Sequence, residues 1–108
     1  MSFTVARLEA FTKGWFIGHF QPTLVDTRDV EVAVKHYRAG DAEAAHHHRI
    51  ATEVTAILSG RVRMLGREFS SGDVVKIDPG TSTAFECLED AVTVVVKHPG
   101  VPQDKYPD

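Results

Sequence analysis

Apolar and polar residues alternate over several short stretches of the chain, which is the period of a β-strand with one buried face. The alternation is clearest where Val30, Val32, Val34 and His36 share one parity. β-branched and aromatic residues also concentrate in short segments, at residues 15–17, 30–37, 54–58, 74–77, 83–88 and 92–96. The pattern therefore predicts strands in these segments.

Turn-forming residues separate the predicted strands, at Gly40-Asp41, Ser59-Gly60, Gly72-Asp73, Asp78-Pro79-Gly80 and Glu89-Asp90 among others. One alanine-rich stretch, residues 41–49, has helical propensity but no apolar stripe, so we interpret it as extended. No segment repeats, and none has the composition of a linker. The sequence predicts one all-β domain over residues 1–108, a barrel or a sandwich, because these architectures leave few sheet edges unpaired.

Composition excludes several classes of function. The chain has 108 residues, of which 25% are charged, and a formal net charge of −3. A dedicated nucleic-acid binder would carry a surplus of positive charge, and no apolar run approaches the ~20 residues that span a bilayer. Cys87 is the single cysteine, and no basic and apolar leader opens the sequence. We therefore expect a cytoplasmic protein without a nucleic-acid or membrane partner.

The candidate chemistry lies in a run of three histidines and the glutamate that follows it. On a strand, His46 and His48 leave the same face and His47 the opposite one. Glu53 suits the facing strand of a hairpin if the chain turns near residues 49–52. Two imidazoles and one carboxylate can bracket a divalent metal, the ligand set typical of non-haem iron that also suits Mn, Ni, Co or Zn. Taken alone, the pattern also fits loop histidines beside a surface glutamate.

The wider spacing resembles the first sequence motif of the cupin superfamily, at Gly40, His46, His48, Glu53 and Gly60. Residues 72–83, with the Pro79-Gly80 turn, resemble the second motif. The resemblance covers residues 40–83 and implies a small single-domain cupin, a double-stranded β-helix or jelly-roll barrel. It also implies that His46, His48 and Glu53 bind a divalent transition metal.

The second motif departs from the family pattern at two positions. Asp78 stands where a proline is usual, and Thr83 stands where the family's fourth metal ligand, normally histidine, is expected. A threonine hydroxyl is a poor transition-metal ligand, so three protein ligands with open positions are expected. His36 is a candidate substitute ligand if Val32 and Val34 face the barrel interior.

The resemblance also implies a substrate pocket beside the metal. By strand parity its candidate residues are His36, Arg38, Thr55, Ile57, Thr83 and Phe85. Most of these side chains are apolar or neutral, so they indicate no substrate class. Arg38 is the cation whose parity allows contact with an anionic substrate.

Two flanking segments bear on the partners of the protein. The aromatic segment 15–20 either covers one mouth of the barrel or packs against a second subunit, and the resemblance favours a homodimer. Residues 99–108 contain three prolines and are expected to form an extended tail without regular strand or helix.

The sequence leaves three functions open and does not decide whether the protein is an enzyme. The first is a metal-dependent enzyme acting on a small organic molecule, by dioxygenase-type (oxidoreductase) or isomerase and lyase chemistry. The second is a non-catalytic cupin that binds a small molecule. The third is a metal-independent sugar-nucleotide isomerase or epimerase, in which His46 or His48 moves a proton.

Overall fold

The computed structural model describes residues 1–108 and contains eight strands preceded by two single-turn 3-10 helices, η1 (Leu8–Ala10) and η2 (Thr12–Gly14). The strands are β1 (Trp15–Ile17), β2 (Glu31–Tyr37), β3 (Ala42–His47), β4 (Thr52–Met64), β5 (Arg67–Ser70), β6 (Val74–Ile77), β7 (Thr83–His98) and β8 (Tyr106–Pro107). All strand pairs are antiparallel. The alanine-rich stretch is extended, as predicted. Neither helix is long and apolar enough to cross a membrane.

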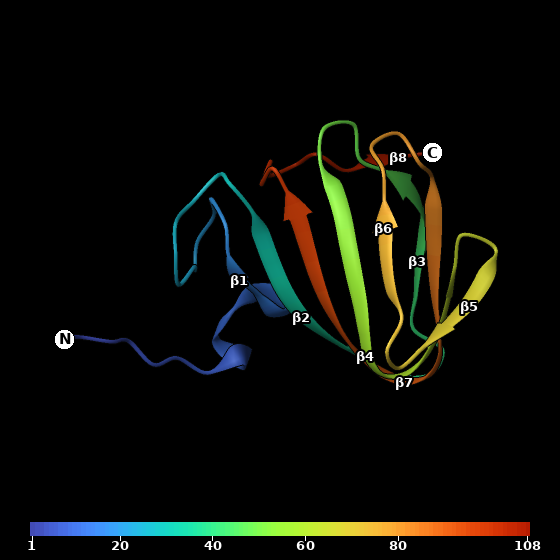
Figure 1. Ribbon diagram of the computed structural model, residues 1–108, viewed down its shortest axis with the longest axis horizontal. Coiled ribbons are helices and arrows are strands. Elements are labelled where there is room, and N and C mark those ends of the chain that lie inside the picture. The colour runs from blue at the N-terminus through green and yellow to red at the C-terminus, as the bar shows by residue number, and fades with distance from the viewer.

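The two long strands, β4 and β7, organise the fold because each contributes to two layers. Residues 52–57 of β4 pair with residues 93–98 of β7, and residues 61–64 pair with residues 85–89. β1, β2 and β6 extend the first layer, and β3, β5 and β8 extend the second. Figure 1 shows both long strands curving at the lower end of the barrel, while the N-terminal segment projects away from it. The all-β barrel prediction is confirmed.

Gly60 lies where β4 changes layer. Its φ is +83°, a region that disfavours other residues, and a Cβ here would lie 2.1 Å from the carbonyl oxygen of Asp90. The pairing of β4 with β7 shifts register on both sides of Ser59. The prediction that strands end at the turns Ser59-Gly60 and Glu89-Asp90 is therefore wrong. Both long strands continue through these irregularities.

The hydrophobic core fills the end of the barrel where the long strands bend. Its fully buried residues are Ile57, Val62, Cys87 and Ala91, and Tyr37, Phe69 and Phe85 pack against them. The prediction that Cys87 faces inward is confirmed. This core closes one end of the barrel and leaves the opposite end free for a cavity.

The inward face of β2 is opposite to the one that the valines suggest. Glu31 and Ala33 are buried, whereas His36 is exposed. The outer face of β2 lies against the N-terminal segment, where Gly14 approaches the carbonyl oxygen of Val34 closely. Val34 is half-buried beside Leu8 and Phe11 of this segment, so the alternation identified a partly buried face that does not belong to the barrel interior.

The C-terminal tail lies across the second layer. Two of its residues form β8, where Tyr106 pairs with His47 and Pro107 pairs with His46. The expectation of a tail without regular strand is therefore wrong at these two residues. Pro107 is tolerated because β8 is an edge strand, which needs only part of its main-chain hydrogen bonds.

Candidate metal centre and cavity

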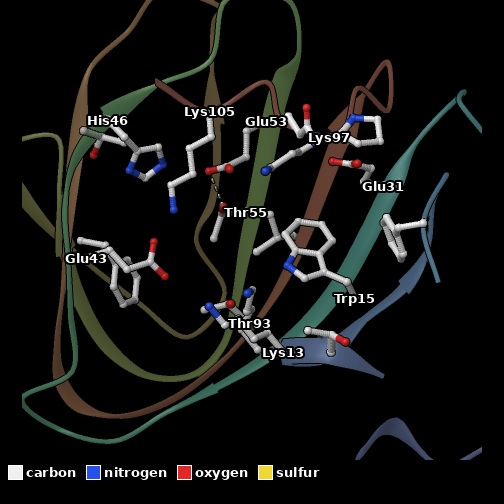
Figure 2. Close-up of a pocket in the computed structure, with 18 of the residues that line it drawn as sticks. Lys13, Trp15, Glu31, Glu43, His46, Glu53, Thr55, Thr93, Lys97 and Lys105 are labelled. Atoms are coloured by element: carbon white, nitrogen blue, oxygen red, sulfur yellow. Dashed lines mark hydrogen bonds between the residues drawn. The ribbon is translucent and has the colours of Figure 1, made fainter. Parts of the chain in front are cut away.

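A cavity of about 590 Å³ opens at the end of the barrel opposite the core. β1, β2, β3, β4 and β7 supply its walls, together with Lys105 from the C-terminal tail. Figure 2 shows His46 and Glu53 on the upper wall and Trp15 on the side of β2. His46, Thr55, Thr83, Phe85 and Glu53, all predicted from the sequence, line this cavity.

His48 follows β3 and is 6% exposed. Its Nδ1–H donates to the main-chain carbonyl of Asp104. This contact fixes the tautomer and leaves the lone pair of Nε2 free. Nε2 is buried and has no hydrogen-bond partner, although Oε1 of Glu53 lies 3.4 Å away. The Glu53 carboxylate raises the pKa of His48, and burial opposes this effect.

Asp104 holds the connection between β3 and β4 in place. Its carboxylate accepts hydrogen bonds from the backbone N–H groups of Arg49 at 3.0 Å, Ile50 at 3.1 Å and Ala51 at 2.9 Å. Burial acts to raise the pKa of Asp104, but the three N–H groups outweigh it and the pKa is lowered. Sequence reasoning missed this residue, because an aspartate within a proline-containing tail gives no signal of its partners.

The second cupin-like motif contacts the same site through its turn. The backbone N–H of Gly80 donates to the carbonyl oxygen of His48 at 2.6 Å. The Pro79-Gly80 turn therefore positions the main chain of His48, while Asp104 orients its ring.

Glu53 lies on the cavity face of β4, two residues before Thr55. The Thr55 hydroxyl donates to Oε2 of Glu53 at 3.4 Å, the dashed line in Figure 2. Burial acts to raise the pKa of Glu53, but His48, Lys97 and His46 together outweigh it, so its pKa is lowered. The carboxylate is therefore held as an anion facing His48.

β3 and β4 do not pair with each other, so the hairpin predicted for the segment between His46 and Glu53 is wrong. β3 pairs with β7 and β8, whereas β4 pairs with β5, β6 and β7. The connection crosses between the two layers. His46 and Glu53 consequently face the cavity from different layers.

The rings of His46 and His48 lie with centroids 5.4 Å apart, nearly perpendicular to each other. Nδ1–H of His46 donates to the carbonyl oxygen of Ala44 at 3.1 Å, which again leaves Nε2 free. His47 points away, as predicted, with Nδ1 2.8 Å from Oδ1 of Asp108 and its ring stacked on Tyr106. No group of three histidine, cysteine, aspartate or glutamate side chains is arranged to hold a metal ion.

The donor set nevertheless fits a divalent metal. When two ligand atoms each lie about 2.1 Å from one metal ion and the angle between them at the ion is tetrahedral, they are about 3.4 Å apart. This matches the 3.4 Å between Nε2 of His48 and Oε1 of Glu53. The unpartnered Nε2 is a buried polar atom that a metal would satisfy. His46, on the same side of the cavity, is the third donor and would need to turn its ring toward the pair.

Three of the predicted pocket residues lie elsewhere. Ile57 belongs to the closed core, and His36 and Arg38 are exposed on the outside of the barrel. The pocket prediction is therefore wrong for these residues. For His36 and Arg38 the reason is that the valine-rich face of β2 was assigned to the interior, whereas Ile57 faces inward but lies at the closed end of the barrel. Thr83 lies opposite His46 in the pairing of β3 with β7, where the missing fourth ligand was expected.

The cavity is rich in charge, contrary to the neutral pocket expected from the sequence. Its lysines are Lys13, Lys35, Lys97 and Lys105, and its glutamates are Glu31, Glu43 and Glu53. Lys35 lies on β2 at the parity that the sequence analysis assigned to the outside. The error in strand parity therefore hid the main chemical feature of the cavity.

The aromatic segment at residues 15–20 covers part of the mouth of its own barrel. Trp15 and Phe20 line the cavity, and Trp15 lies beside the ammonium groups of Lys35 and Lys97. Of the two arrangements that the sequence left open, the structure therefore shows the one in which this segment covers a mouth of its own barrel.

The fold resembles several solved structures. An uncharacterized conserved protein with a double-stranded β-helix domain from Klebsiella pneumoniae is 25% identical, with a TM-score of 0.64 over 71% of this chain and 69% of that chain. KdgF from Halomonas sp. is 21% identical, with a TM-score of 0.62 over 69% of this chain and 74% of that chain.

Two larger enzymes share the fold over part of their length. Oxalate decarboxylase from Bacillus subtilis is 18% identical, with a TM-score of 0.63 over 75% of this chain and 24% of that chain. The DMSP lyase DddQ from Ruegeria pomeroyi is 22% identical, with a TM-score of 0.64 over 82% and 46%. No protein-family model and no curated protein matches the sequence.

Proposed function

The chain is a cupin by its double-stranded β-helix fold, and on this premise we propose that it is a metal-dependent enzyme acting on a small organic molecule. The observation that carries the proposal is the buried, unpartnered Nε2 of His48, 3.4 Å from Oε1 of Glu53 at the wall of a cavity. His46, His48 and Glu53 would hold the metal.

Two of the proposed ligands already have a partner that orients them. The main-chain carbonyl of Asp104 accepts the Nδ1–H of His48, and Thr55 donates to Glu53. Such outer contacts fix the tautomer and direction of metal ligands. When bound, a divalent ion supplies Lewis-acid chemistry that polarises an oxygen of the substrate.

The ionisable groups around the site favour isomerase or lyase chemistry over a dioxygenase reaction. Proton transfer needs positioned acids and bases, and the cavity wall carries glutamates and lysines beside the proposed ligands. Glu43 is one such group, and it accepts a hydrogen bond from the hydroxyl of Tyr37 at 3.1 Å. The acid and base groups of the cavity would move the substrate protons.

The experiment is metal analysis of protein purified without chelators from metal-replete cells. We expect close to one divalent ion per chain, and loss of the ion in His46→Ala and Glu53→Ala. His47→Ala is the matched control, because this neighbouring ring points away from the cavity. A wild-type protein that binds no metal under these conditions would overturn the proposal.

Activity assays separate the enzyme from the alternatives. Turnover of a small acid, thiol, phenol or sugar that is lost on chelation supports the proposal, and oxygen consumption would assign it to the dioxygenase class. Bound metal without turnover over a broad panel supports a non-catalytic binding protein. Activity on a nucleotide sugar that survives chelation supports the metal-independent isomerase.

The proposal also includes the quaternary state of the protein and its location in the cell. We infer a homodimer, since Met1, Phe3 and Val5 are strongly exposed on a segment that projects from the barrel. The free thiol of Cys87 is compatible with a reducing cytoplasm. Analytical ultracentrifugation of the full chain tests the dimer, and a monomer at all accessible concentrations would contradict it.

A further inference from the structure

Thr93 carries a buried hydroxyl that nothing in the chain satisfies. The residue is 1% exposed, its Oγ1 has no hydrogen-bond partner, and it lines the cavity. Buried hydroxyl groups without a partner are uncommon because they lose their hydrogen bonds to water. The Thr93 hydroxyl is therefore a free hydrogen-bond donor at the wall of the cavity.

Lys35 is the direct neighbour of Thr93 across the sheet. The two residues pair between β2 and β7, so their side chains leave the same face. Burial has the largest effect on Lys35 and lowers its pKa, and the charges of Lys13, Lys97 and Lys105 act in the same direction against that of Glu43. The cavity thus concentrates positive charge around one buried donor.

Lys35 and Lys97 share an aromatic neighbour, and neither forms an ion pair within 4 Å. Their Nζ atoms lie 5.0 Å and 4.8 Å from the centre of the Trp15 ring. The only lysine of the chain in an ion pair is Lys76, which contacts Asp78 on the outside of the barrel. The ammonium groups in the cavity therefore form no direct ion pair, although the charges of Glu43 and Glu53 act on Lys35 and Lys97.

The glutamates of the cavity do not supply the missing partners. Glu53 faces His48 and Thr55, and Glu43 accepts from Tyr37. Glu31 pairs with Lys97 between β2 and β7, yet the two side chains form no ion pair within 4 Å. If a metal engages Glu53, the charge left in the cavity becomes still more positive.

We propose that the cavity binds a small organic anion, whose carboxylate or phosphate lies between Lys35 and Lys97 and accepts a hydrogen bond from Thr93. Lys105, on the C-terminal tail, lines the same cavity, and Figure 2 shows it beside His46 and Glu53. This inference rests on the proposed function in naming the substrate class of that cavity. Charge-assisted hydrogen bonds to ammonium groups are the strongest polar contacts that such a cavity can offer.

Trp15 provides a direct readout, because it is the only tryptophan in the chain and lies beside both ammonium groups. Metal-free protein, desalted to remove the chelator, is titrated with malonate, with inorganic phosphate and with neutral malonamide at constant ionic strength. We expect saturable changes in Trp15 fluorescence with an anion and none with malonamide. Binding of malonate alone would assign the site to a carboxylate, and binding of phosphate alone would assign it to a phosphate group.

Variants locate the bound anion. Lys35→Met should weaken binding about tenfold, and Lys105→Met, at an exposed tail position, about threefold. Thr93→Val removes the unpartnered hydroxyl while retaining its shape, so we expect about fivefold weaker binding with an unchanged or higher melting temperature. Lys76→Met is the matched control and should bind as the wild type does.

The outcomes separate this inference from the metal proposal. Anion binding by a protein that takes up no metal from metal-replete cells would support the anion site and overturn the metal-dependent enzyme. A metal-loaded protein that binds neither malonate nor phosphate would overturn the anion site and leave the metal proposal standing. Binding that Lys35→Met, Lys105→Met and Thr93→Val all leave unchanged would also overturn it.

Discussion

The carbonyl oxygen of Asp104 accepts the Nδ1–H of His48, so a residue of the C-terminal tail orients a side chain on the connection between β3 and β4. The carboxylate of the same residue binds three consecutive backbone N–H groups of that connection. Asp104 is therefore a positioning residue, which acts on the candidate metal centre through His48 rather than by contact with a substrate.

Replacing Asp104 should affect stability and metal binding together. Asp104→Ala leaves the N–H groups of Arg49, Ile50 and Ala51 without their acceptor, which should cost about 2 to 3 kcal/mol of unfolding free energy. Metal affinity should fall about 10- to 100-fold, because the lost carboxylate no longer holds in place the main-chain carbonyl that orients His48. Urea denaturation and metal titration check the two effects. Asp78→Ala, at an exposed ion pair, is the control and should change stability by less than about 1 kcal/mol.

Thr83→His should restore the ligand that the family pattern expects. Thr83 lies opposite His46 and lines the cavity, so an imidazole at this position can reach the space beside His46, His48 and Glu53. We expect metal to bind at least about tenfold more tightly, since an imidazole replaces a poor ligand. Competition with a chromogenic chelator measures the affinity. Equal or weaker binding in a folded Thr83→His protein would argue that the metal does not lie beside Thr83.

Gly60→Ala should destabilise the whole fold. The added Cβ would meet the carbonyl oxygen of Asp90 at 2.1 Å, and the φ of +83° is unfavourable for alanine. The backbone conformation alone costs about 1 to 2 kcal/mol, and the contact adds to this cost. Thermal denaturation gives the result. Gly66→Ala, at a comparable φ of +73° with no atom within 4 Å of its Cβ, separates the two contributions and should lose less stability.

Cys87 should react slowly with thiol reagents in the folded protein. Its side chain is 1% exposed, and burial raises its pKa, with the charges of Asp41 and Asp90 acting in the same direction. Since only the thiolate reacts, the rate at neutral pH should be far below that of a free cysteine and should rise only above the ordinary pKa of about 8.5. Alkylation followed by mass spectrometry, with the urea-unfolded chain as control, measures this. Rapid labelling of the folded protein at neutral pH would contradict the buried position.

The motif residues could be predicted because their roles are local or follow from spacing. His47 points away from its neighbours since alternate side chains on a strand leave opposite faces. Gly60 is required by a single backbone conformation. The valines of β2 predicted the wrong inward face because alternation indicates that one face is buried without indicating what buries it. Here Val34 lies half-buried beside the N-terminal segment, while Lys35 and Tyr37 line the cavity.

By itself the sequence determined the class of fold and the three candidate ligands, because alternation and motif spacing depend on residues that are close in the chain. Only the tertiary structure decided that His48 meets Asp104, 56 residues away, and that Lys35, Lys97 and Lys105 share one cavity with Trp15. These groups lie on different strands or on the tail, and their proximity depends on how two long strands bend and pair. No local pattern encodes that geometry, which is why the charge of the cavity became visible only in the folded chain.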